Sequence, residues 1–131
     1  MRQFLKIPAP PLDKMYGIAY NEYMKKILYY KTSDGKCPYL DWYNSLDKGV
    51  RPYIAKRLTR VLEGNYGDHK RLNADLSELR FKVGSGYRIY YSEFKNTIII
   101  LLCAGDKSGQ QTDIKNANKY IKDYKERFKN G

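Results

Sequence analysis

Residues 77–103 read SELRFKVGSGYRIYYSEFKNTIIILLC, and this stretch decides which fold we expect. Over residues 77–83 apolar and charged side chains alternate, which is the period of a half-buried strand. Residues 84–86, GSG, turn the chain, and residues 87–92 return as a second strand. Residues 97–103 are almost wholly apolar, as expected of a central strand that is covered on both faces.

The chain on either side of this stretch supplies one more strand and three helices. Residues 26–31 are β-prone and predict a first strand. Two helices with apolar stripes follow, one beginning at Pro38 and one capped by Asp47. We expect a last helix capped by Thr112 or Asp113. The order β-α-α-β-β-β-α predicts an α+β fold, in which a helical hairpin packs on a twisted, mainly antiparallel sheet.

Composition and charge divide the chain into two parts. Residues 1–24 contain Pro8, Pro10 and Pro11 and show no apolar periodicity, so we interpret them as an N-terminal extension. Residues 25–131 form the expected domain, and they carry most of the net charge of +11. A domain this basic is typical of proteins that bind a polyanion or an acidic protein.

The sequence also argues against several kinds of protein. No apolar run approaches the roughly 20 residues of a membrane-spanning helix, and no secretory signal is present, so we expect a cytoplasmic protein without membrane contact. Cys37 and Cys103 are expected to be reduced and structural, because they show no CxxC spacing. With His69 as the one histidine, we predict no metal site and no cofactor.

Basic side chains gather on two neighbouring strands. The pleat is able to place them on one surface together with a tyrosine: these residues are Arg80, Lys82, Arg88 and Tyr90. Like charges on adjacent strands are costly unless an anion lies between them, and phosphate suits the guanidinium group. The alternative is that these basic groups pair with Glu78 or Glu93 at the sheet edge.

Two loops carry further polar candidates. In residues 105–111 Lys107 is placed to neutralise a phosphate, and Gln110 and Gln111 to orient a ribose or base, because loops at strand ends often hold reactive groups. A solvated loop without function is the alternative. Residues 67–71 form a second, basic loop with Lys70 and Arg71.

Four motifs together resemble a known family. They are DGKCPYLDW (34–42), LSELR (76–80), GSGYRIYY (84–91) and LLCAGDKS (101–108). Their order and spacing resemble the RelE/ParE toxin superfamily, in particular its HigB-like branch of addiction module killer proteins. The resemblance covers about residues 25–120, and Ala104 stands where that branch has glycine.

The resemblance implies a RelE-like fold and the toxin of a type II toxin–antitoxin pair. RelE-type toxins cleave mRNA on the ribosome without a metal ion, and a small helix-turn-helix antitoxin neutralises them. A ParE-like inhibitor of DNA gyrase, or an inactive toxin that serves as an antitoxin-binding corepressor, are the alternatives. The oligomeric state stays open.

The resemblance also assigns roles to residues. Arg88 of the GYR motif corresponds to the phosphate clamp, Arg80 and Lys82 to the basic pair before it, and Lys107 to the basic residue after the last strand. Lys82 is our first candidate for the general base. The family's tyrosine or histidine acid has no clear counterpart here, and Asp113 and Gln111 lie nearest. The expected RNA contacts are Lys70, Arg71, Tyr90, Gln110 and Gln111.

Overall fold

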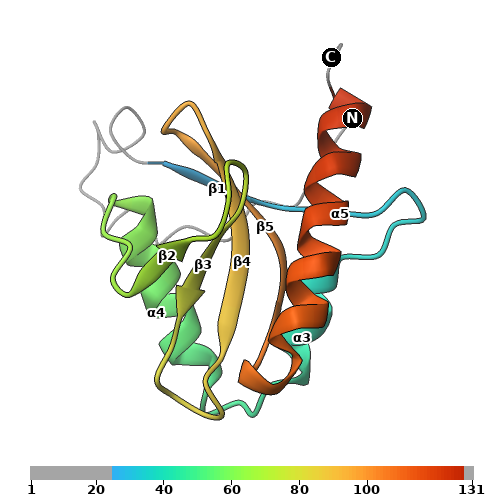
Figure 1. Ribbon diagram of the computed structural model, residues 1–131. Coiled ribbons are helices and arrows are strands. Elements are labelled where there is room, and N and C mark those ends of the chain that lie inside the picture. The colour runs from blue at the N-terminus through green and yellow to red at the C-terminus, as the bar shows by residue number, and fades with distance from the viewer. Residues whose placement is uncertain (1–24, 129–131) are drawn as a thin grey trace.

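The computed structural model describes residues 25–128, which form one sheet with helices on both of its faces (Figure 1). The strands are β1 (Lys26–Tyr29), β2 (His69–Arg71), β3 (Ser77–Arg80), β4 (Arg88–Phe94) and β5 (Ile98–Gly105). The helices are α3 (Pro38–Ser45), α4 (Arg51–Leu62) and α5 (Gln110–Phe128), and a 3₁₀ turn over Lys107–Gly109 leads into α5. The extension expected over residues 1–24 lies outside the described residues.

The sheet has the strand order β1-β5-β4-β3-β2. β1 runs parallel to β5, whereas the other neighbouring strands are antiparallel. β5 therefore lies inside the sheet, and residues Ile99 to Cys103 of it are buried, as expected of a central strand. The predicted α+β fold with a mainly antiparallel sheet is confirmed.

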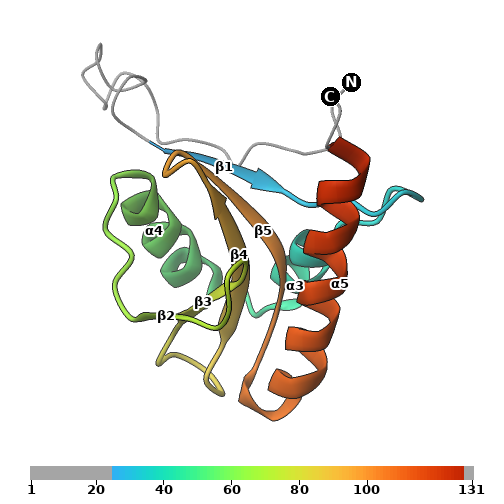
Figure 2. The same ribbon diagram turned by 45° about the horizontal axis from the view of Figure 1, so that its top comes forward.

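Two cores lie on opposite faces of the sheet. Ile89 and Tyr91 of β4 join the core under α3 and α4, whereas Tyr90 joins the core under α5. This division follows from the alternation of side chains along a strand. Figure 2 shows α4 and α5 on opposite sides of the strands. We refer below to the α4 side and the α5 side of the sheet.

Several predicted strand limits are wrong. The first strand ends at Tyr29 rather than at residue 31, and the strand that begins at Ser77 ends at Arg80 rather than at residue 83. Residues 67–71, which we interpreted as a loop, contain the edge strand β2. All three residues of β2 are exposed, so no apolar alternation marks it, and its pairing with β3 makes it a strand.

The predicted start of α3 is confirmed, whereas the caps predicted for α4 and for the last helix are wrong. α3 begins at Pro38 as expected, but Asp47 does not cap α4, whose N-cap residue is Val50 with no side-chain cap. The backbone carbonyl of Asp47 instead accepts a hydrogen bond of 2.9 Å from Val50 N. At the last helix Asp106 caps the 3₁₀ turn, and residues 112–113 lie inside the first turn of α5. The last helix therefore starts upstream of both predicted caps.

Candidate functional site

Two arginines face each other across β3 and β4. Arg80 and Arg88 are direct cross-strand partners. Tyr90 lies two residues after Arg88 and therefore on the same side, which is the α5 side because Tyr90 belongs to that core. The structure thus brings Arg80, Arg88 and Tyr90 to one face, as the alternation predicts. Like charges at such positions destabilise a sheet unless something compensates them.

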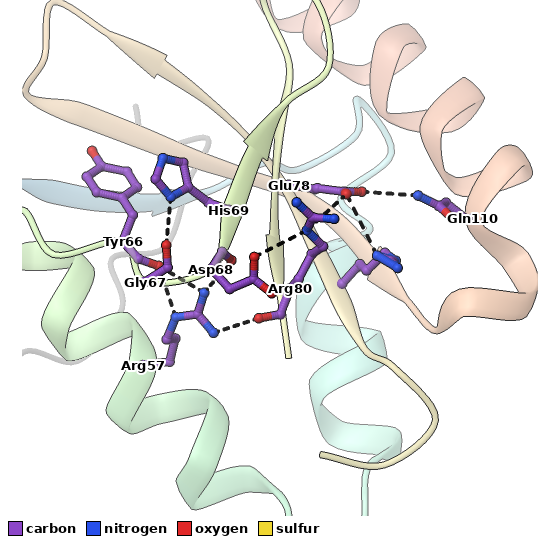
Figure 3. Close-up of polar contacts among 9 residues, drawn as sticks. Arg57, Tyr66, Gly67, Asp68, His69, Glu78, Arg80 and Gln110 are labelled. Carbon is purple, nitrogen blue, oxygen red and sulfur yellow. Dashed lines mark hydrogen bonds and ion pairs between the residues drawn. The ribbon is translucent and has the colours of Figure 1, made fainter. Parts of the chain in front are cut away.

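A buried carboxylate lies between the two arginines. Glu78 is 1% exposed, and its Oε2 lies 3.7 Å from Arg80 Nε and 3.7 Å from Arg88 Nη1 (Figure 3). Its Oε1 accepts a hydrogen bond of 3.3 Å from Gln110 Nε2 in the first turn of α5. Buried charges persist in proteins when they are paired in this way. Glu78 thus allows the two arginines to face each other. The sequence left open whether these arginines pair with Glu78 or bind an anion, and the pairing with Glu78 is present.

Both guanidinium groups keep donors for a further ligand. The side chain of Arg80 is 35% exposed and that of Arg88 is 14% exposed. Arg80 Nε also lies 3.5 Å from Asp68, whose side chain is half exposed. The Nε atoms of both arginines also lack a hydrogen-bond partner within residues 25–128, but they are buried, so a ligand would have to bind the terminal Nη atoms. These ion pairs are longer than charged hydrogen bonds of about 2.7–2.9 Å, so the arginines are able to donate to phosphate oxygens.

A carboxyl group reaches the same region from α5. β5 ends at Gly105, directly opposite Arg88. A Cβ atom at Gly105 would lie 2.0 Å from Asp113 Oδ2, so the missing side chain makes room for this carboxyl group. Burial raises the pKa of Asp113, and the neighbouring Asp106 raises it further. Asp113 therefore holds its proton to a higher pH than an ordinary aspartate, which suits a group that transfers protons.

Tyr90 lies fully buried beside these charges. Its hydroxyl group has no hydrogen-bond partner among the described residues. Burial raises the pKa of Tyr90 most, Glu78 and Asp113 raise it further, and Arg88 lowers it. The hydroxyl therefore lies within electrostatic range of the cluster and stays protonated. Tyr90 was expected to contact RNA, but its side chain is fully buried and does not reach the surface in this structure.

Lys107 lies where β5 leads into the last helix. Its backbone N donates to Ser85 O over 3.4 Å, and Ser85 Oγ donates to Asp106 Oδ2 over 3.1 Å. The turn between β3 and β4 is thus held against the start of the last helix. A hollow of about 720 Å³ lies here, lined in part by Ser85, Asp106 and Asp113. Lys107 is exposed beside it, at the end of the sheet where Arg88 pairs with Gly105.

Lys82 lies apart from this cluster. β3 ends at Arg80, and Lys82 then lines a different hollow together with side chains of α4. The expectation that Lys82 shares the surface of Arg88 and Tyr90 is therefore wrong, because the strand that would have kept the alternation ends two residues earlier. This placement removes the support for Lys82 as general base at the arginine pair.

The remaining expected RNA contacts fall in different places. Lys70 pairs with Glu78 across β2 and β3, so it lies on the α5 side beside the arginine pair. Arg71 donates to two backbone carbonyls of the loop that follows it, which leaves it less available. Gln111 is exposed in the first turn of α5. His69 is exposed, and its Nδ1 lies 2.8 Å from Gly67 O.

Among residues 25–128, the remaining acidic and sulfur groups form no metal-binding cluster. Glu93, the other pairing candidate, binds Lys25 instead at 2.8 Å. Cys37 and Cys103 are free and buried, and burial raises the pKa of the Cys103 thiol to about 12. Residues 25–128 contain no group of three His, Cys, Asp or Glu side chains arranged to hold a metal ion. In the same part of the chain no helix is long and apolar enough to cross a membrane.

Residues 41–125 match the phage derived protein Gp49-like family (DUF891). The chain belongs to this family, which is a family of RelE-like, addiction-module toxins. The matched segment contains the whole cluster around Glu78. An uncharacterized protein of Haemophilus influenzae is 47% identical over 64 residues, which cover 49% of this chain. The match covers 65% of that protein, just under two thirds of its length.

Proposed function

We propose that this protein is the toxin of a type II toxin–antitoxin pair, of the HigB-like kind, and that it cleaves mRNA on the ribosome without a metal ion. The observation that carries the proposal is the pair Arg80 and Arg88, held around the buried Glu78 with both arginine side chains still partly exposed. Membership of a family of toxins supports the same conclusion. Because ribosomes translate mRNA in the cytoplasm, we expect the protein to act there.

The proposed reaction is an attack of the ribose 2′-OH on the adjacent phosphate. The bond from the 2′-oxygen to phosphorus forms and the bond from phosphorus to the 5′-oxygen breaks, which leaves a 2′,3′-cyclic phosphate and a 5′-OH. Negative charge grows on the phosphate, so fixed positive charge lowers the barrier. Arg88 and Arg80 supply this charge from the sheet and Lys107 from the end of β5.

The reaction also moves two protons. One leaves the 2′-OH, and another must reach the departing 5′-oxygen. Asp113, with its raised pKa at the Gly105 gap, is our candidate for proton transfer. It replaces Lys82, which lies in another hollow.

The partners follow from the same proposal. The protein acts on mRNA at the ribosome, and a small helix-turn-helix antitoxin neutralises it. Net charge of +11 supports both kinds of partner, because RNA is a polyanion and antitoxin segments that cover a basic surface are favoured when they are acidic. We expect Lys70, beside the arginine pair, to contact the message.

The proposal is tested by inducing the protein in cells that lack its antitoxin. We expect growth arrest, and primer extension should find new 5′ ends inside translated messages. Arg88→Ala should relieve the arrest and the cuts while the variant stays folded. Lys119→Ala, on an exposed position of α5, removes the same charge and serves as the matched control.

Three outcomes would contradict the proposal. Equal toxicity of a folded Arg88→Ala variant would show that the arginine pair is not the active face. DNA breaks with intact mRNA would favour a gyrase inhibitor. A chain that binds antitoxin but neither arrests growth nor cuts mRNA would be an inactive corepressor.

A further inference from the structure

The α4 side of the sheet carries a second basic hollow. It has a volume of about 400 Å³ and lies between α4 and the chain that follows β3. Such a volume falls in the lower part of the range of about 300–1,000 Å³ for ligand sites. Its lining includes Tyr53, Lys56, Arg57, Arg60, Phe81 and Lys82. No acidic residue lines it within the part of the chain that the structure describes.

One ring and three charges of this hollow face solvent. Tyr53 is 63% exposed, which is unusual for a large aromatic side chain in this protein. Tyr53, Lys56 and Arg60 are spaced at three and four residues along α4, so they share one face of the helix. Lys56, Arg60 and Lys82 are exposed, and their side chains make no ion pair with any residue of 25–128. Unpaired positive charges held this close together repel one another, and a bound anion removes that cost.

The fourth cation, Arg57, fixes the shape of the hollow instead of facing a ligand. Its Nη1 donates to Arg80 O over 2.7 Å, and its Nη2 donates to Asp68 O over 2.6 Å (Figure 3). Its guanidinium group also lies 4.7 Å from the centre of the Phe81 ring. These contacts tie α4 to the end of β3. The backbone positions that carry the exposed groups are therefore fixed relative to one another before a ligand arrives, which lowers part of the entropy lost on binding.

We propose that this hollow binds single-stranded nucleic acid, with one base stacked on Tyr53 and backbone phosphates on Lys56, Arg60 and Lys82. Exposed aromatic rings beside a basic groove are the usual means of holding single strands without regard to sequence. An acidic protein segment would pair with the three cations, but pairing with them does not require an exposed aromatic ring beside them. Lys82 follows Arg80 by two residues, which is at most about 7 Å along the chain, so one RNA strand that passes the end of β3 would reach both surfaces.

The test measures binding of a labelled single-stranded RNA of about 12 nucleotides by fluorescence anisotropy. Every 2′-OH of the probe is methylated, so the protein cannot cleave it by the proposed reaction. Tyr53→Leu should weaken binding about five-fold or more, and Tyr53→Phe should not. Lys56→Ala with Arg60→Ala should lower the slope of log affinity against log salt by about 1.4, which corresponds to two phosphate contacts.

A matched control separates this hollow from the general charge of the protein. Lys119→Ala with Lys122→Ala, both on exposed positions of α5, removes two positive charges elsewhere. It should change the salt slope much less than the α4 double variant does. A duplex of the same sequence should bind less tightly than the single strand and should be insensitive to Tyr53→Leu, because its bases are not available for stacking.

Two results would overturn the inference. The first is that the Tyr53 and α4 variants bind the probe no differently from the α5 control. The second is that they keep their affinity for the probe but no longer form a complex with the antitoxin encoded beside the toxin gene, which would assign the hollow to an acidic protein. If the protein binds the probe through Tyr53 but cuts no mRNA, this result would refute the proposed function and leave the present inference intact.

Discussion

Replacement of Glu78 by glutamine tests the charge balance of the candidate site most directly. The Glu78→Gln variant would keep the size of the side chain and an oxygen for Gln110, but it would leave Arg80 and Arg88 facing each other without the carboxylate. At an effective dielectric constant of about 20, two unit charges 3.7 Å apart attract by about 4.5 kcal/mol. Desolvation of Glu78 and repulsion between the arginines offset much of this attraction.

The structure narrows the loss of stability that we expect from Glu78→Gln. Loss of one partner of a buried ion pair costs about 3–5 kcal/mol, but Arg80 is 35% exposed and keeps Asp68. We therefore expect Glu78→Gln to lower the free energy of unfolding by about 2–3 kcal/mol. Arg88 should account for most of this loss, because Glu78 is its only ion-pair partner among residues 25–128.

The assay is urea unfolding of a double-mutant cycle made from Glu78→Gln and Arg88→Met. We expect a coupling energy of about 1–2 kcal/mol. The exposed pair Lys125–Asp75 is the matched control: its atoms lie 2.7 Å apart, but the side chains are 46% and 44% exposed, so its coupling should stay below about 1 kcal/mol. A Glu78–Arg88 coupling no larger than that of the control would refute the argument that burial makes this ion pair important.

Four further results are expected. Gly105→Ala should cost about 1–3 kcal/mol of stability in urea by displacing the Asp113 carboxyl group, and adding Asp113→Ala should recover most of it. Asp113→Asn should have a higher melting temperature than the wild type at pH values above the raised pKa of Asp113. This gain should vanish below about pH 4, where the wild-type carboxyl group is protonated in both the folded and the unfolded state. Tyr90→Phe should leave stability unchanged or raise it by up to about 1 kcal/mol, because the hydroxyl lacks a partner among the described residues; a larger loss in urea unfolding would point to a partner. A chain starting at Met24 should unfold at the same urea concentration as the full chain, because we interpret residues 1–24 as an extension that adds little to the fold.

The fold was predictable where side-chain patterns reflect burial. The alternation after Ser77 and the apolar run before Cys103 predict their strands because each follows from which faces of the sheet are covered. β2 carries no such signal, since His69–Arg71 is exposed on every side chain and is a strand only through its backbone bonds to β3. The cap of the last helix could not be chosen either, because several polar residues between 105 and 113 are equally able to cap.

The candidate site was predictable only in part, because its residues meet through register and packing. Alternation places Arg80 and Arg88 on comparable faces, but only the observed register makes them direct partners. The same register buries Glu78 between them. The sequence does not reveal this burial, because an acidic residue in an alternating strand is expected to be exposed. The approach of Asp113 to Gly105 depends on how α5 packs on β5, and no local pattern encodes that contact.

The charge count of the cluster connects its stability with its proposed substrate. Arg80 and Arg88 contribute two positive charges and Glu78 one negative charge, so the buried core of the site has a net charge of +1. Asp68 approaches Arg80 from the exposed side, where an incoming anion is able to displace it. A phosphodiester carries one negative charge, which equals the net charge of the two arginines and Glu78 before the separate charge of Lys107 is added. Under the proposed function, Glu78 thus lowers the positive charge that meets a phosphodiester within an RNA strand, in addition to holding the two arginines together.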